Sequence, residues 1–465
     1  MPQPNIVLIF MDDMGWRDLG CSGSTFYETP NIDALSREGM RFDRAYAACP
    51  VCSPSRASLM TGRHPARVGV TDWIDHTGTN HPMHGRVIDA PYIHYLPEEG
   101  KPLAQAMREA GYATWHVGKW HLGLSDHYPE KYGFDVNIGG CWWGHPRDGY
   151  FSPYGIETLP EGPDGEFLTD RLTDEAIQLI ENAQEDRPFF LNLCHYAVHT
   201  PIQAKERDIA RFEAKAQKWG LDKVNPFAAG EKHPTVEHGA HHVLRRTIQS
   251  DPTYAALLWN LDENVARLVQ ALKKAGRWEN TLLVFTSDNG GLATAEGSPT
   301  CNAPASEGKG WLYEGGIRVP MFAVWPGVIK PMTQTMTPAY TPDFYPTFLQ
   351  AAGQPLDPEQ HRDGTSLLPV MRGEASVQRP LFWHYPHYGN QGGRPGAAVL
   401  LGDYKLIQCF EDDHIELYNV TDDVAETQDL SQRLPEKAAE LRGILQSWQK
   451  DVGAKFPEKN PDYQT

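Results

Sequence analysis

Residues 49–63 read CPVCSPSRASLMTGR. Proline suits the first turn of a helix, and the preceding Ser53 can cap that helix. We therefore predict a helix over residues 54–60 that ends at Gly62, because glycine readily adopts the left-handed conformation found after helices. Cys52 then lies at the helix N-terminus, where unpaired N–H groups and the helix dipole favour an anion. The stretch predicts a site at which a cysteine meets an anionic ligand.

Cys52 has three interpretations. A lone cysteine in a chain of this size is most often a buried and inert small hydrophobe. Cys49 and Cys52 also form a C-x-x-C pair, which can be a redox motif, but no thioredoxin-like βαβ pattern surrounds it. Arg56 lies one turn into the predicted helix, on the same side as Cys52. This basic residue favours the third interpretation, a site built for an anion.

The composition limits the classes of function. The chain has 465 residues, enough for one large α/β domain with an appendage or for two or three smaller domains. Its net charge is −18 and it has no basic patch, so we expect no nucleic-acid partner. The seven cysteines are odd in number and unevenly spaced, which does not indicate a disulfide framework.

The sequence also carries information about its compartment. No apolar run is long enough to span a membrane, so we expect a soluble protein without a membrane partner. The chain enters a predicted strand at once, without a basic region or a small-residue cleavage site. We therefore expect a cytoplasmic protein from the sequence as written, and a periplasmic or secreted one if a leader was removed. Its oligomeric state stays open.

Apolar runs alternate with amphipathic stretches along most of the chain. An all-apolar run is typical of a strand buried on both faces, and a stripe of spaced leucines is typical of a helix. The alternation predicts an α/β fold, a largely parallel sheet covered by helices on both faces. The predicted strands are residues 5–10, 113–117, 188–196, 281–286 and 319–324, and the predicted helices include 102–110, 168–181 and 254–275.

The pattern changes near residue 377. Three short segments linked by turns, 397–401, 404–410 and 415–419, predict an antiparallel meander, and a helix follows over 435–452. We therefore divide the chain into a large N-terminal domain, 1–376, which carries the candidate site, and a smaller C-terminal α+β subdomain, 377–465.

Two polar pairs directly follow predicted buried strands, Asp12-Asp13 and Asp288-Asn289. Neighbouring parallel strands would bring the two pairs within a few ångströms of each other. Three carboxylates and an amide oxygen suit Ca²⁺ or Mg²⁺ and not zinc. Either pair alone is explained by turn formation at a strand end, where Asp and Asn are common. Both pairs together with the CSPSR stretch favour a metal site.

Further polar residues stand in short glycine-rich or proline-containing motifs. Lys119 and His121 alternate in GKWHLG, so an extended backbone would direct both into one pocket while Trp120 packs away. His199 stands in HTP, and Lys309 lies among glycines that permit close backbone approach. Each motif alone is weak support for a site.

Together these motifs resemble those of the type I, formylglycine-dependent sulfatases of the alkaline phosphatase-like superfamily. The matching motifs are DD after the first strand, C-x-P-S-R-x-x-x-x-T-G-R, GKWH, H-x-P, DNG and G-x-K-x-x-x-x-E-G-G-x-R-V-P. The resemblance covers residues 5–320 and continues more weakly through 402–407. It implies an alkaline phosphatase-like fold, a large mixed and mostly parallel sheet between helices.

The resemblance also implies the catalytic machinery. Cys52 would be converted to Cα-formylglycine by a formylglycine-generating or anaerobic maturation enzyme and would serve, as its hydrate, as the nucleophile. Arg56 would orient its hydroxyls, His121 would act as base and His199 would protonate the leaving alcohol. The residues implied to clamp sulfate are Lys119 and Lys309, and those implied to hold Ca²⁺, with Mg²⁺ as the alternative, are Asp12, Asp13, Asp288 and Asn289.

The expected activity is hydrolysis of a sulfuric ester. The overall resemblance to bacterial polysaccharide and arylsulfatase A-like sulfatases indicates a sulfated carbohydrate, and we expect exo-removal of sulfate from a galactose-type sugar. A glycosaminoglycan uronate or a simple aryl sulfate are alternative substrates. The alternative functions are phosphonate or phosphate diester hydrolysis within the same superfamily and non-catalytic binding of an anion or glycan.

Three segments are expected to shape the substrate pocket, residues 71–96, 141–154 and 202–250. The last is polar with few apolar periodicities, and we expect a lid or excursion there. Aromatic side chains stack on sugar rings, and charged or polar ones bind sugar hydroxyls. The candidate pocket residues are Trp73, Asp75, His76, Trp142, Trp143, His145 and Arg147.

Overall fold

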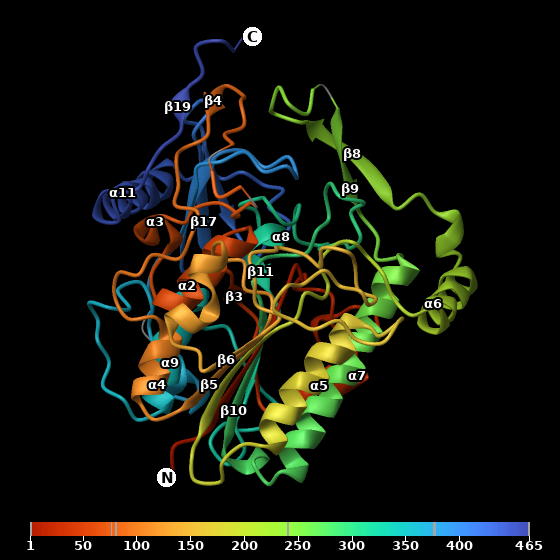
Figure 1. Ribbon diagram of the computed structural model, residues 1–465. Helices are drawn as coiled ribbons and strands as arrows, with labels where there is room; N and C mark the ends of the chain where they lie inside the picture. Colours follow the sequence, from red (N-terminus) through yellow and green to blue (C-terminus); the bar gives the residue numbers. More distant parts are fainter. Residues whose placement is uncertain (1, 76, 80, 240, 375–377, 464–465) are drawn as a thin grey trace.

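The centre of the molecule is an eight-stranded mixed sheet (Figure 1). The computed structural model describes residues 2–75, 77–79, 81–239, 241–374 and 378–463. The strand order is β13-β2-β12-β10-β1-β7-β5-β6, and the strands from β10 to β6 are parallel. In contrast, β12 is antiparallel to both β10 and β2. The bounds are β1 (Asn5–Met11), β2 (Met40–Phe42), β5 (Ala113–Gly118), β6 (Val136–Ile138), β7 (Phe189–Cys194), β10 (Thr281–Ser287), β12 (Phe322–Val324) and β13 (Thr333–Thr335).

The strands in the middle of this sheet are buried on both faces. Every residue of β1, β7 and β10 is buried, as their all-apolar or nearly all-apolar sequences predict. β1 lies between β10 and β7, which places a chain segment near the N-terminus in the middle of the fold. The strands predicted over 5–10, 113–117, 188–196 and 281–286 are therefore confirmed, with small differences at their ends.

Helices cover both faces of the sheet, as Figure 1 shows. Val7 and Ile9 of β1 pack in one core with α1 (Pro30–Arg37), α5 (Leu168–Glu181) and α7 (Pro252–Lys274). Ile6, Leu8 and Phe10 point the other way, because side chains alternate along a strand. They pack in a second core with α2 (Cys52–Thr61), α4 (Leu103–Glu109) and α9 (Phe344–Ala351). This arrangement confirms the predicted α/β fold with a sheet between helical layers.

The C-terminal part forms a second, antiparallel sheet. β15 (Leu381–Tyr385), β16 (Gly396–Leu401), β17 (Tyr404–Cys409) and β18 (Ile415–Asn419) pair in sequence order. α11 (Pro435–Asp451) packs Leu441 and Leu445 against Val399 and Leu406 of this sheet. The predicted meander and helix are confirmed, and β15 is an additional strand. The predicted domain boundary at 376/377 lies outside the described residues.

One predicted strand was wrong. The strand predicted over 319–324 is two strands, because Pro320 lies between β11 (Arg318–Val319) and β12, which belong to different sheets. The polar excursion predicted over 202–250 contains α6 (Glu206–Trp219) and a hairpin of β8 (Phe227–Lys232) and β9 (His242–Arg246). Besides short 3-10 helices, the described residues also form α3 (Pro65–Val68), α8 (Glu314–Ile317), α10 (Leu368–Met371), β3 (Ala45–Tyr46), β4 (Val87–Ile88), β14 (Ala339–Tyr340) and β19 (Glu458–Lys459).

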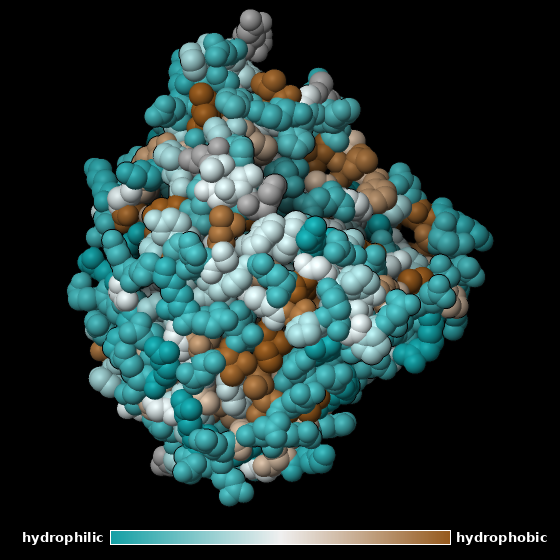
Figure 2. Space-filling model, viewed as in Figure 1, coloured by the Kyte–Doolittle hydropathy of each residue, from teal (hydrophilic) through white to brown (hydrophobic). Residues whose placement is uncertain are grey.

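The visible surface is largely hydrophilic, with scattered hydrophobic residues (Figure 2). Such scattered residues are normal on a globular protein. Among the described residues, none of the helices combines the length and the apolar character that crossing a lipid bilayer requires.

Candidate active site

Cys52 is the first residue of α2, as the prediction of a helix N-terminus at this position requires. The helix ends at Gly62, whose φ of 67° is in the left-handed region. The predicted cap is wrong, because Ser53 lies inside the helix and its Oγ accepts a hydrogen bond from the N–H of Ile74 at 3.0 Å. Ser53 thereby fixes the loop that follows Thr71 against the start of α2.

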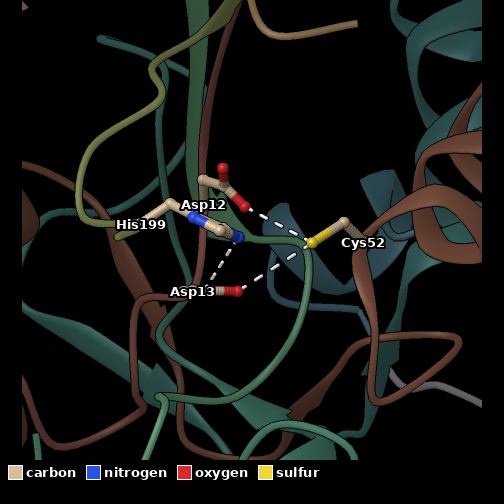
Figure 3. A group of neighbouring side chains, drawn as sticks. All are labelled: Asp12, Asp13, Cys52 and His199. Atoms are coloured by element: carbon tan, nitrogen blue, oxygen red, sulfur yellow. Dashed lines mark hydrogen bonds and ion pairs between the residues drawn. The ribbon is translucent and has the colours of Figure 1, made fainter. Parts of the chain in front are cut away.

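The two polar pairs meet beside Cys52. β1 and β10 are parallel with Met11 opposite Ser287, so the residues after both strands share one edge of the sheet. The N–H of Asp13 donates to Asp288 Oδ1 at 3.2 Å, and Asn289 Nδ2 donates to Asp13 Oδ1 at 2.8 Å. Figure 3 shows the Cys52 thiol facing this edge, with Sγ 3.6 Å from Asp12 Oδ1 and 3.9 Å from Asp13 Oδ1.

Each of the three buried carboxylates contacts a buried cation. Lys119 Nζ lies 2.7 Å from Asp12 Oδ2, and Lys309 Nζ lies 2.9 Å from Asp13 Oδ2. Two guanidinium nitrogens of Arg56 donate to Oδ2 of Asp288 at 2.9 and 2.7 Å. The site is thus a local cluster of positive and negative groups inside an acidic protein, and an anion bound there would meet fixed cations.

Two histidines complete the cluster. His199 Nε2 lies 3.1 Å from Lys309 Nζ and 3.5 Å from Asp13 Oδ2. His121 Nε2 lies 2.7 Å from the carbonyl oxygen of Ile74. The predicted extended backbone around His121 is wrong, since its φ is 59°. With this turn, Lys119 is fully buried and does not line the cavity that His121 lines.

Burial and neighbouring charges shift the proton affinities of these groups. Burial raises the pKa of Asp12 to about 8, against the lowering effect of Lys119. Burial also acts to raise the pKa of Asp13, but Lys309, His199 and Lys119 together hold it well below its usual range. Burial and the charge of Lys309 lower the pKa of His199 to about 4, so its imidazole is neutral at pH 7.

The residues present fit a hard divalent cation. Asp12, Asp13, Asp288 and Asn289 offer carboxylate and amide oxygens, the ligands that Ca²⁺ and Mg²⁺ prefer. Within the part of the chain that the structure describes, the buried Oδ1 of Asn289 accepts no hydrogen bond. The raised pKa of Asp12 indicates that its basic neighbours do not fully compensate the buried negative charge. One Oδ of Asp12, one of Asp13, Cys52 Sγ and a ring nitrogen of His199 lie within 4.8 Å of one another.

A cavity of about 310 Å³ opens onto Cys52, His121, His199 and Lys309. Five of the predicted pocket residues line it: Trp73, Asp75, Trp142, Trp143 and His145. Trp142 and Trp143 stack with ring centroids 4.0 Å apart. Arg147 is not among the lining residues, because its guanidinium lies 5.7 Å from the centre of the Trp143 ring and its side chain is exposed. His76 lies outside the described residues.

Comparisons with known proteins identify the family. The family model described as Sulfatase matches residues 4–354, more than half of the chain. The chain belongs to the sulfatase family. This sulfatase is a hydrolase of sulfate esters, and its mixed sheet with a C-terminal antiparallel subdomain is the alkaline phosphatase-like fold. A second model, described as N-sulphoglucosamine sulphohydrolase, C-terminal, matches residues 307–450.

Similar proteins cover nearly the whole sulfatase. A sulfatase of Formosa agariphila is 30% identical over 523 aligned residues, covering 96% of this chain and 88% of the relative. The N-acetylgalactosamine-6-sulfatase of Canis lupus familiaris is 33% identical, covering 87% of this chain and 72% of the relative. A solved structure of Ps i-CgsB in complex with k-i-k-neocarrahexaose is 30% identical with a TM-score of 0.77, covering 99% of this chain and 94% of that one.

Sequence reasoning missed three polar residues of the sulfatase cavity, Glu296, Asn390 and Gln391. Glu296 Oε1 accepts hydrogen bonds from Asn390 Nδ2 at 3.0 Å and from Gln391 Nε2 at 3.1 Å. No motif marks these loop positions, and the last two belong to the C-terminal subdomain. The described part of 202–250, which was expected to shape the pocket, does not line this cavity.

Proposed function

We propose that this sulfatase removes sulfate from a sulfated carbohydrate by means of a formylglycine derived from Cys52 and a bound Ca²⁺. The observation that carries the proposal is the place of Cys52 at the start of α2. There it faces Asp12 and Asp13 at 3.6 and 3.9 Å and lines a cavity with aromatic walls. This arrangement pairs a modifiable residue with a cluster of buried carboxylates and basic side chains and with a sugar-sized pocket.

Position 52 is the proposed nucleophile. Formylglycine, formed from Cys52 by a maturation enzyme, would supply as its hydrate one hydroxyl for attack on sulfur and a second for release of sulfate. The unmodified thiol is a poor nucleophile here, because burial raises its pKa and keeps it protonated. Arg56, one turn along α2, is the residue proposed to orient the hydroxyls at position 52.

Lys119 and Lys309 are the proposed sulfate ligands. Both ammonium groups already lie within 3 Å of the carboxylates that face Cys52. A sulfate ester carries one negative charge, and charge moves onto the leaving oxygen in the transition state. Fixed cations in a buried site stabilise such a charge without reorganisation.

Asp12, Asp13, Asp288 and Asn289 would hold the metal ion. Ca²⁺, with Mg²⁺ as the alternative, would polarise the sulfate group as a Lewis acid and fix its orientation. Without the ion, the same carboxylates are balanced by Lys119, Lys309 and Arg56. These cations would exchange part of their contacts for the sulfate oxygens when the ion is bound.

His199 and His121 are the proposed proton carriers. His199 lies beside Lys309, where it could protonate the departing alcohol. The pKa of His199 is low in the empty site, but an anionic sulfate group beside the imidazole favours its protonated form. His121, in the GKWH motif, is the proposed base for the second hydroxyl at position 52.

The proposed substrate is a galactose-type sugar with the sulfated unit at a chain end. The cavity of about 310 Å³ is of a size for one sugar ring, and its stacked tryptophans offer an apolar face for the ring. One relative is named for a 6-sulfated N-acetylgalactosamine, and one solved relative was crystallised with a neocarrahexaose. A uronate of a glycosaminoglycan and a simple aryl sulfate are the alternatives.

Two experiments test the proposal. Mass spectrometry of the peptide that contains Cys52, from a host with the maturation enzyme, should show the aldehyde; a thiol that stays unmodified in that host would contradict the nucleophile. A panel of galactose monosulfates with the sulfate at each ring position should contain one that is clearly preferred. If none is hydrolysed while a phosphonate or phosphate diester is, diester hydrolysis replaces the proposed function; if nothing is hydrolysed, non-catalytic binding does.

A further inference from the structure

A second cavity of about 320 Å³ adjoins the first. Glu296, Asn390 and Gln391 line both cavities, so the two spaces meet at one wall. The other side of the second cavity is formed by the β8–β9 hairpin, which Figure 1 shows projecting beside the C-terminal subdomain. The chemistry proposed above uses no residue of this hairpin.

The shared wall lies beside the proposed leaving-group acid. Glu296 Oε2 accepts a hydrogen bond from Thr200 Oγ1 at 3.1 Å, and Thr200 directly follows His199. The departing alcohol is the saccharide itself. A saccharide chain that leaves the sulfated ring on the side of Glu296 meets this wall, and the second cavity is the space beyond it.

The hairpin contacts the rest of the chain both at its base and near its tip. At its base, the N–H of Arg246 donates to the carbonyl of Ala293 at 2.9 Å, and Arg245 pairs with Glu307 at 2.6 Å. Near its tip, His84 Nδ1 lies 2.7 Å from a carboxylate oxygen of Glu237. These contacts hold a two-stranded ribbon that would be marginally stable alone.

The lining suits a sugar ring. Four histidines of the hairpin line the cavity together with apolar side chains that include Leu244, which is 54% exposed. His233 and His238 stack at 4.0 Å, and the Oγ1 of Thr235 lies within 3.0 Å of Nδ1 of both rings. A neutral imidazole can donate one hydrogen bond to a sugar hydroxyl and accept another from one, and apolar side chains can pack on the C–H face of a sugar. The lining histidines are His233, His238, His241 and His242.

We propose that the second cavity is a subsite for the sugar unit next to the sulfated one, so that the preferred substrate is a saccharide of two or more units. This inference rests on the proposed function, because it assigns the cavity to the same substrate chain. Figure 2 agrees with such a surface, since hydrophobic residues gather at the upper right, where Figure 1 places β8 and β9. The hairpin therefore acts as a specificity element for chain length.

The first test compares chain lengths. The probes are 4-nitrophenyl sulfate, the preferred galactose monosulfate, and a disaccharide with that same sulfated galactose at its non-reducing end. We expect kcat/KM for the disaccharide to exceed that for the monosaccharide about tenfold, the effect of one or two additional hydrogen bonds with partial burial of a ring. A disaccharide-to-monosaccharide ratio of kcat/KM near one in the wild-type enzyme would overturn the subsite.

The second test locates the effect on the hairpin. The double substitution His238→Ala/His241→Ala should bring the disaccharide-to-monosaccharide ratio close to one, and His238→Gln/His241→Gln, which keeps hydrogen-bonding groups, should recover part of it. The control is His414→Ala, a partly exposed histidine that lines neither cavity and should leave the ratio unchanged. An unchanged ratio in the double alanine variant would overturn the proposal.

A binding measurement separates this proposal from the proposed function. The sulfate-free disaccharide, titrated into the enzyme, should shift the ring C–H resonances of His238 and His241, and galactose alone should not. Absence of these shifts at saturating disaccharide overturns the subsite, whatever the turnover. A different result contradicts the proposed function: enzyme with confirmed formylglycine hydrolyses no sulfate ester, not even 4-nitrophenyl sulfate. In that case the second cavity is not a substrate subsite either.

Discussion

Position 52 determines what the rest of the cluster can do. Its side chain lies within 4 Å of two carboxylates that contact the two candidate sulfate-binding lysines. A formylglycine hydrate has two hydroxyls on one carbon, whereas a serine has one. A serine at position 52 should therefore change the number of turnovers and not the binding of the substrate.

We expect Cys52→Ser to give at most one product per active site. The variant can transfer the sulfuryl group to its single hydroxyl but has no second hydroxyl to release it, so the protein should become heavier by about 80 Da, the mass of SO₃. Intact-protein mass spectrometry and a burst experiment measure both quantities. Sustained multiple turnover, free of wild-type enzyme, would contradict the two-hydroxyl mechanism.

The metal should be removable and necessary. We expect exhaustive chelation, or Asp288→Ala, to abolish turnover, because the remaining carboxylates lose the cation that orders them with the substrate. Metal content by mass spectrometry should fall from about one Ca²⁺ or Mg²⁺ per chain toward zero. Substitution of the exposed Asp164 by Ala is the matched control and should retain both metal and activity. Full activity at a verified metal content near zero would disprove the assignment.

His199 should matter most when the leaving group is poor. We expect His199→Ala to lower kcat/KM for a sugar sulfate by about 10²–10⁴ and to have a much smaller effect on 4-nitrophenyl sulfate, whose phenolate departs without a proton. Steady-state kinetics on the two substrates test this difference. Equal losses on both would leave His199 as a binding residue.

Among the elements, β5 places Lys119 in the site, because the strand ends at Gly118, the residue before the lysine. Gly118 has a φ of 99°, and a Cβ at this position would lie 1.9 Å from the carbonyl oxygen of Cys194 in β7. The strand can approach β7 this closely only because the residue before the lysine has no side chain.

We expect Gly118→Ala to lower the free energy of unfolding by about 3 kcal/mol, the combined cost of left-handed strain and overpacking. Activity per folded molecule should fall as well, because Lys119 is displaced from Asp12. Gly111→Ala is the matched control at the other end of β5, with a φ of 94° and no atom within 4 Å of the added Cβ. It should cost about 1–2 kcal/mol and leave kcat unchanged. Equal effects of the two substitutions would refute this role of Gly118.

In the whole molecule, a buried ion cluster joins the C-terminal sheet to α8 of the N-terminal part. Lys405 of β17 lies 3.0 Å from a carboxylate oxygen of Glu314 in α8 and 2.6 Å from one of Glu426, and all three side chains are fully buried. The charges connect the C-terminal subdomain to the loop that carries Lys309.

We expect Lys405→Met to destabilise the protein by about 3–5 kcal/mol, because it leaves the buried carboxylate of Glu426 without a cation, whereas Glu314 keeps Arg318 at 3.4 Å. Adding Glu426→Gln should restore part of the stability by removing one uncompensated charge. Lys437→Met, which removes a surface pair with Glu440 at 2.7 Å, is the control and should change stability by less than about 1 kcal/mol. Denaturant unfolding measures all three, and a control as damaging as Lys405→Met would contradict the argument.

The sequence predicted the α/β fold, the middle strands of the large sheet and the main helices, and it marked candidate metal ligands that stay a prediction. β1 and β10 were predictable because a strand buried on both faces has a continuous apolar run, here too short for a helix and followed by polar turn residues. The meeting of Asp13 with Asp288 was predictable because residues after parallel strands share one edge of a sheet. Short motifs of fixed spacing marked Cys52.

The loops that face the site could not be predicted from the sequence, because packing between distant segments places them. Glu296 and Asn390 are 94 residues apart, and no local rule of propensity or periodicity relates two such loop positions. The left-handed backbone at His121, the position of Arg147 over Trp143 and the second cavity under the β8–β9 hairpin likewise follow from packing between distant segments. Local sequence sets the conformation of an element, whereas the contacts between loops depend on the free energy of the whole packed chain.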